Sequence, residues 1–172
     1  MKIKNNPICA FISVLIIIIF SLYTTSALKT IPCEKDMVSI FICNFIHIDL
    51  FHLIANLYAI YSLSRVEILL GSKKFFILVL FLSIFNTVFE SILHKIINTP
   101  CSIGISGILY GVITFEILFT NNIDYNGLFA IFLNIYASSI SNTKSSLSGH
   151  MIGAISGILG SLLLKQSGQL TL

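Results

Sequence analysis

The chain has 172 residues, of which 56% are hydrophobic and only 10% are charged, and its mean hydropathy is +0.97. A soluble domain carries about 25% charged residues, so this composition excludes a soluble globular protein and predicts an all-α, multi-pass integral membrane protein. The formal net charge of +3 is too small and too scattered for a nucleic-acid-binding surface, and we expect the lipid bilayer, and no nucleic acid, as a partner.

Six apolar segments predict six transmembrane helices within a single membrane domain that takes in residues 1–172. The first segment, residues 8–28, is long enough to cross roughly 30 Å of hydrocarbon. Because its apolar core exceeds the about 7–15 residues of a signal peptide, we interpret it as a retained span. A polar connection follows, in which residues 37–48 are amphipathic enough to lie at the membrane interface. The other spans are expected at residues 50–70, 75–93, 102–120, 127–140 and 148–164.

The basic residues indicate how these spans are oriented. An even number of spans puts both termini on one side of the membrane, and we expect that side to be the cytoplasm. The excess of basic residues on that side has the sign of the positive-inside rule. The cytoplasmic side would hold Lys2, Lys4, Arg65, Lys73, Lys74 and Lys165, and the other side would hold Lys29, Lys35, Lys95 and Lys144.

The four cysteines, Cys9, Cys33, Cys43 and Cys101, have no spacing that is typical of metal ligands. We therefore expect no metal and no cofactor. Cys33, Cys43 and Cys101 fall on one side of the predicted topology. The sequence leaves two interpretations open for them, a disulfide within this group or small apolar thiols.

Three of the predicted spans carry a polar residue near the same end. The second, fourth and sixth spans run in one direction, and His52, Ser106 and His150 lie near their starts. Polar groups inside a membrane are costly and usually functional. Their matching depth on three parallel helices predicts a single site just below the outer surface.

Glycine spacing predicts that the fourth and sixth spans pack closely. Small residues three or four positions apart on a helix let two backbones approach each other. Such packing would bring Ser106 and His150 within hydrogen-bonding reach. The glycines are Gly104, Gly107 and Gly111 on the fourth span, and Gly153 and Gly157 on the sixth.

The residue types in this site point to acyl transfer. A serine hydroxyl is a poor nucleophile at neutral pH unless a base takes its proton, and here Ser106 is the candidate nucleophile and His150 the candidate base. His52 and Asn56 are four residues apart and share a helix face, where they can donate hydrogen bonds to an oxyanion. Ser106 also lies at a helix amino terminus, where free N–H groups and the dipole favour a developing negative charge.

Several separated stretches form an ordered set of motifs. They are G-x-S-G at residues 104–107, the tyrosine Tyr110, H-x-x-G-x-x-x-G at residues 150–157, H-x-x-x-x-H-x-x-x-N at residues 47–56, and L-G-S-K-K-F-F at residues 70–76. In this order and on alternate spans, they resemble the rhomboid family of intramembrane serine proteases. The resemblance covers about residues 44–164.

This resemblance implies a role for each residue. Ser106 would be the nucleophile and His150 the general base of a Ser-His dyad, with Tyr110 packed against the histidine. His52 and Asn56 would support the oxyanion, beside Gly104 of the G-x-S-G motif. The substrates would be single-span membrane proteins, cut in or near their transmembrane segments.

The chain departs from the family's pattern in its first loop. Rhomboid proteins often carry a tryptophan-arginine pair there, whereas this chain has no tryptophan and its arginine, Arg65, falls in the second span. With six predicted spans and no seventh, the chain resembles the minimal form of the family.

The same residues also allow other interpretations. Ser106 alone could be a small packing residue, and His52 and Asn56 could be interhelical hydrogen-bonding groups. The chain could be a catalytically inactive rhomboid-like protein that binds membrane clients. It could also be a small transporter in which Glu90 and Glu116 join the histidines as a proton path. The clustering of polar residues at the outer end favours a protease site over a pore.

Overall fold

The computed structural model describes residues 6–25, 36–97, 102–120, 125–127, 129, 132–133, 136 and 147–166. Within these ranges the regular structure is helical, which confirms the predicted all-α class. The helices with defined bounds are α1 (Pro7–Thr24), α2 (Met37–Cys43), α3 (Leu50–Leu70), α4 (Ser72–Ile97), α5 (Ser106–Thr120) and α7 (Leu147–Gln166).

The helices agree with most of the predicted spans. By length and composition, α1, α3 and α4 can each cross a membrane, and α5 and α7 contain shorter apolar stretches. Helix α3 has the predicted bounds of the second span. The predicted fifth span, residues 127–140, lies mostly outside the described residues.

Two helix boundaries differ from the prediction because of glycine. Gly71 has φ +76°, in the left-handed region that glycine adopts without steric cost, so a single residue turns the chain from α3 into α4. Helix α4 therefore begins at Ser72 rather than at residue 75 and continues to Ile97. Gly104 has φ +101°, and α5 begins after it, at Ser106 rather than at residue 102. The prediction that Gly104 lies on a helix face with Gly107 and Gly111 was wrong.

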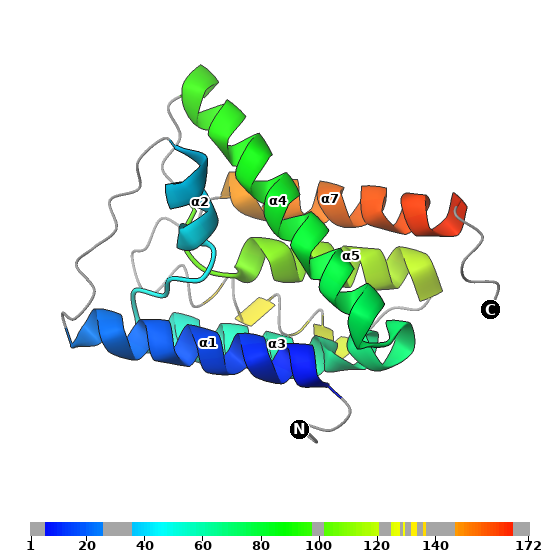
Figure 1. The fold of residues 1–172 in the computed structure, drawn as a ribbon, viewed down its shortest axis with the longest axis horizontal. Helices are drawn as coiled ribbons and strands as arrows, with labels where there is room; N and C mark the ends of the chain where they lie inside the picture. Colours follow the sequence, from blue (N-terminus) through cyan, green and yellow to red (C-terminus); the bar gives the residue numbers. More distant parts are fainter. Residues whose placement is uncertain are drawn as a thin grey trace.

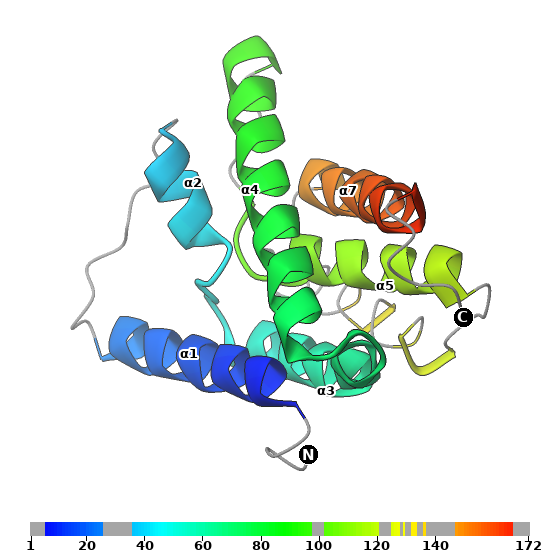
Figure 2. The same ribbon diagram turned by 45° about the vertical axis from the view of Figure 1, so that its right-hand side comes forward.

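The helices form a bundle in which α5 is central. Figures 1 and 2 show α1 and α3 side by side below α5, α7 along its other flank, and α4 crossing the bundle obliquely. The contact between α5 and α7 is the most extensive in the structure. These two helices carry Ser106 and His150, so their packing sets the geometry between those residues.

Glycine allows α5 and α7 to meet backbone to backbone, as the sequence predicted. A methyl group built on Gly153 would overlap the carbonyl oxygen of Gly107, and one built on Gly157 would overlap that of Gly111. Neither neighbour is the mobile end of a side chain. The two helices can therefore lie this close only while positions 153 and 157 have no side chain.

Two buried carboxylates hold helices together at the end of the bundle where α3 finishes. Glu67 is fully buried and accepts hydrogen bonds from the backbone N–H groups of Ile8 and Cys9, both at 2.9 Å. It thereby satisfies the free N–H groups at the start of α1. Glu116 on α5 pairs with Arg65 on α3, with 2.6 Å between Oε1 and Nε. This ion pair gives Glu116 a structural partner.

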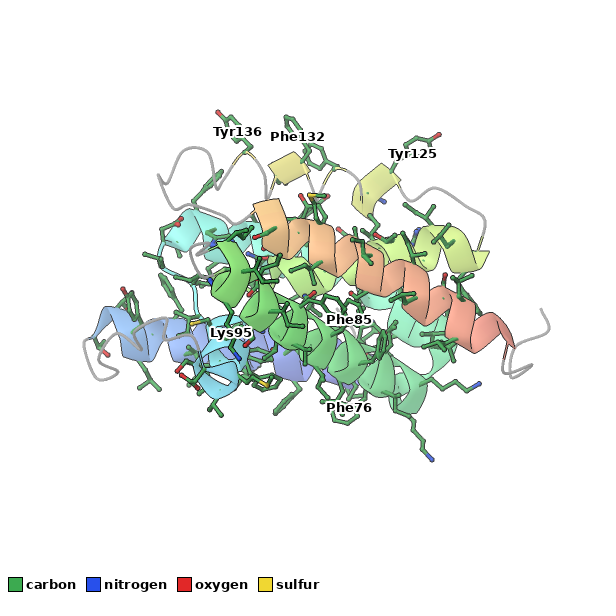
Figure 3. All side chains as sticks on the ribbon, turned by 90° about the horizontal axis from the view of Figure 1, so that it is seen from above. Phe76, Phe85, Lys95, Tyr125, Phe132 and Tyr136 are labelled. Carbon is green, nitrogen blue, oxygen red and sulfur yellow. The ribbon has the colours of Figure 1, made fainter. Side chains whose placement is uncertain are left out.

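Large apolar side chains cover much of the outside of the bundle, as expected for a surface that faces lipid. Phe76, Phe132 and Tyr136 project outward in Figure 3 and are each at least half exposed. Most of the buried side chains are also apolar. The most deeply buried large side chains include Ile16, Val66, Leu82, Ile108, Val112, Ile113 and Phe115.

Candidate active site

Ser106 is the first residue of α5, and the loop before it is fixed by backbone geometry. The N–H of Gly104 donates a hydrogen bond to the carbonyl of Cys43, at 3.0 Å. A methyl group on Gly104 would come within 2.7 Å of His52 Cε1. Glycine is thus required at position 104 both for its φ and for the space that the His52 ring occupies. The loop delivers Ser106 to a buried position that is 5% exposed.

His150 lies in the first turn of α7 and meets this serine. The distance between Ser106 Oγ and His150 Nε2 is 2.9 Å, which is within the range for proton transfer from a nucleophile to its base. The two residues are 44 positions apart in the sequence and are brought together by the glycine contacts between α5 and α7. The structure therefore contains the Ser–His pair that the sequence analysis singled out.

Tyr110 holds the plane of the His150 ring. Tyr110 is one helical turn after Ser106 on α5, and its ring stacks on that of His150 with 4.3 Å between centroids and 11° between planes. Stacking on one face and a hydrogen bond at Nε2 together fix the imidazole in place. This is the packing that the resemblance implied for Tyr110.

His52 and Asn56 lie on the α3 side of the site. His52 reaches the loop before Ser106 through its contact with Gly104. The Asn56 amide is fully buried and donates a hydrogen bond to the His52 carbonyl, at 3.0 Å. Asn56 Oδ1 and His52 Nε2 are buried, and neither has a hydrogen-bond partner among the described residues. The structure thus brings His52 beside the serine loop and places Asn56 one turn further along α3.

A second histidine packs behind His52. His47, in the turn after α2, is fully buried, and its ring centroid is 5.1 Å from that of His52. Burial lowers the pKa of His47 to about 3, and the neighbouring His52 adds to the effect. His47 is therefore neutral at physiological pH and supports the His52 ring by packing.

The comparisons with known proteins bear on this arrangement. The model of the Rhomboid domain matches residues 34–167. The chain belongs to the rhomboid family. A rhomboid protein of Acanthamoeba polyphaga mimivirus, provisionally named as such, is 24% identical over 155 residues, which are 87% of this chain and 88% of that protein. No solved structure matches the chain.

The rhomboid match covers all the residues discussed above, from His47 to His150. It also supports the conclusion that this rhomboid is an integral membrane protein. Within the described residues, no group of three or more histidine, cysteine or acidic side chains is arranged to hold a metal ion. Cys9 and Cys43 are buried free thiols, and burial raises the pKa of Cys43 to about 11. The other two cysteines, Cys33 and Cys101, lie outside the described residues.

One part of the rhomboid site was not predicted from the sequence. A small polar cavity lies beside the dyad, and its lining includes Asn86 and Glu90 of α4 and Ser102 of the loop before α5. The signal for it was available, because Asn86 and Glu90 are four residues apart within a predicted span and must share a face. What the sequence could not show is that this face points toward the serine.

Proposed function

We propose that this rhomboid protein is an intramembrane serine protease, which hydrolyses peptide bonds in or near the transmembrane segments of single-span membrane proteins. The observation that carries the proposal is the buried hydrogen bond between Ser106 and His150. A protein that only binds membrane clients has no need of a nucleophile held against a base. The ion pair between Glu116 and Arg65 likewise counts against a proton path through the bundle.

In the proposed mechanism Ser106 Oγ attacks the scissile carbonyl carbon while His150 Nε2 takes the hydroxyl proton. The oxyanion that forms is stabilised by free N–H groups in the first turn of α5, with His52 and Asn56 as side-chain donors. The intermediate collapses as His150 returns the proton to the departing amine, which leaves an acyl-enzyme on Ser106. Water, deprotonated by His150, then attacks the ester, and Ser106 leaves with the proton.

Cleavage of a reporter in vesicles tests this function. The purified protein and a single-span reporter are combined in proteoliposomes, and the products are identified by mass spectrometry. A cut in or near the reporter's span supports a protease. A reporter that is bound but stays intact would favour the client-binding alternative.

The oxyanion assignment predicts the effect of two α3 substitutions. Asn56→Ala and His52→Ala should each lower kcat by about 10²–10³, the usual cost of one lost donor, while the backbone donors of α5 allow residual turnover. Ser64→Ala is the matched control, because Ser64 is a buried polar residue two turns further along α3 and bonds the carbonyl of Tyr61. If kcat in both variants equals that of the control, neither side chain takes part in the mechanism.

The depth of the site predicts the kind of substrate. If the amino terminus is cytoplasmic, the dyad lies toward the outer surface, near the outer end of a substrate's span. The protease must act on an extended backbone, because a helix keeps its carbonyls in internal hydrogen bonds. Unwinding in lipid leaves polar groups unsatisfied at several kcal/mol each. Substrates with glycine or proline in the span should therefore be preferred, since their helices break more easily.

A pair of substrates checks this preference. One carries glycines in its span, and the other has leucine at the same positions. The glycine substrate should be cut faster, near the outer end of its span, with release of its outer domain. Equal rates of cleavage for the two would exclude helix instability as the selecting property.

A further inference from the structure

Among the buried polar side chains of helix α4, two line the small cavity beside Ser106 and His150 and are not used by the proposed mechanism. Asn86 and Glu90 are one helical turn apart on the same face and are 2% and 4% exposed. We call them the α4 polar pair. An ionisable group buried inside a membrane protein is costly to keep and is usually retained for function, so the contacts of this pair indicate what it does.

Asn86 contacts the residue that follows the nucleophile. A methyl group built on Gly107 would lie 3.0 Å from Asn86 Nδ2 and 3.1 Å from the carbonyl oxygen of Gly149. The Asn86 amide therefore packs where the first turn of α5 meets the first turn of α7. A displacement of Asn86 would therefore change the position of Gly107, which directly follows Ser106.

Glu90 contacts the residue that precedes the base. A methyl group on Gly149 would lie 2.6 Å from Glu90 Oε1 and would also overlap the Ser102 hydroxyl. The Ser102 hydroxyl and the Glu90 carboxyl therefore meet at Gly149, which brings the loop before α5 to the same point. Glu90 thus joins three elements: α4, the loop that leads to Ser106, and the turn that carries His150.

The two contacts involve equivalent positions, one next to each residue of the dyad. Each member of the α4 polar pair touches a glycine adjacent in sequence to one dyad residue, and both members line the small cavity that also reaches Ser106 and His150. The glycines allow the approach, since a side chain at position 107 or 149 would displace the Asn86 amide or the Glu90 carboxyl from its place.

We propose that Asn86 and Glu90 are positioning residues that set the distance between Ser106 and His150 by holding Gly107 and Gly149 against α4. This inference rests on the proposed protease function. Because a nucleophile and its base must stay in hydrogen-bonding contact, a small shift of α7 relative to α5 is costly, and a misplacement of about 1 Å can lower a rate about 10²-fold. The pair acts on turnover through the dyad.

The test compares four variants on one helix: Asn86→Ala, Glu90→Ala, Glu90→Gln and Ser83→Ala. Ser83 is the matched control, because it is a buried polar residue of α4 whose hydroxyl bonds the carbonyl of Val79 in its own helix. For each variant we would measure kcat and KM on a single-span reporter, the rate of labelling by a fluorophosphonate, and Tm.

We expect Asn86→Ala and Glu90→Ala to lower kcat and the labelling rate about 10-fold to 100-fold with little change in KM. Glu90→Gln, which keeps the size and the hydrogen-bonding oxygen, should restore most of the activity. A purely structural role would lower Tm without moving kcat in the folded protein. If Glu90→Ala fails to fold, Asn86→Ala and Glu90→Gln still decide the question.

Four results would overturn the inference. The first is a folded Asn86→Ala or Glu90→Ala variant with the kcat of Ser83→Ala. The second is a Glu90→Gln variant as inactive as Glu90→Ala, since the charge would then be what matters. The third is that the unsubstituted protein is not labelled by the fluorophosphonate. In that case the proposed function fails, and the inference fails with it. The fourth is that the unsubstituted protein and its variants are labelled equally fast. This result would overturn the inference and leave the proposed function standing.

Discussion

Ser106→Ala is expected to abolish cleavage of a transmembrane substrate while the protein stays folded, and His150→Ala should do the same. A nucleophile and its base act as one unit, so loss of either removes nearly the whole effect, on the order of 10⁶ in kcat. The cost to folding is far smaller, because one hydrogen bond contributes about 1 kcal/mol. Cleavage assays in proteoliposomes, with Tm measured on the same preparations, separate the two effects.

The double variant sharpens this expectation. Because the two residues form one unit, Ser106→Ala combined with His150→Ala should be no slower than either single variant. Additive losses would mean that the two act separately and that the 2.9 Å contact between them has no catalytic meaning. Near-normal cleavage by Ser106→Ala would show that Ser106 is not the nucleophile.

Gly153→Ala and Gly157→Ala are expected to cost more stability than any other single methyl group added to α7. Alanine in place of glycine normally stabilises a helix by about 1 kcal/mol. Here the added carbon would overlap the carbonyl oxygens of Gly107 and Gly111, which belong to the backbone of α5. Overpacking of this kind costs about 1–3 kcal/mol or more and outweighs the gain in propensity. Both variants should lower Tm, and any protein that still folds should have lost the dyad contact and its activity.

Gly160→Ala is the matched control for these variants. It lies on the same helix, and its nearest neighbour would be the Leu78 Cδ1 atom, at 3.3 Å. The end of a leucine side chain can move by a few tenths of an ångström, so the propensity term should prevail and Tm should stay constant or rise. Equal Tm for Gly153→Ala and Gly160→Ala would contradict the backbone contact between α5 and α7.

Much of the dyad's geometry could be predicted from the sequence, because it depends on local and periodic signals. The apolar length of residues 50–70, with Asp49 before it and Gly71 after it, predicts the bounds of α3. Asp49 accepts a hydrogen bond from the N–H of His52 at 2.7 Å, and Gly71 turns the chain. Glycine spacing predicted the close approach of α5 and α7 in the same way, since it requires only that small residues recur on one face.

The parts that could not be predicted depend on which way a face points. In a soluble helix the polar face marks the solvent side, but in a membrane protein the lipid and the core are both apolar. The sequence therefore shows that Asn86 and Glu90 share a face of α4 without showing that this face meets Gly107 and Gly149. Gly104 illustrates a second limit: its φ of +101° goes with a tertiary hydrogen bond from its N–H to the carbonyl of Cys43, and α5 begins only after it, at Ser106.

Labelling with a fluorophosphonate tests the central claim most directly, because the reagent reacts with a serine only where a base has activated it. The purified protein is labelled in detergent or in vesicles, and the modified peptide is located by mass spectrometry. We predict one adduct, on Ser106, which is absent from both Ser106→Ala and His150→Ala. An unlabelled protein, or an adduct that persists in Ser106→Ala, would contradict this prediction.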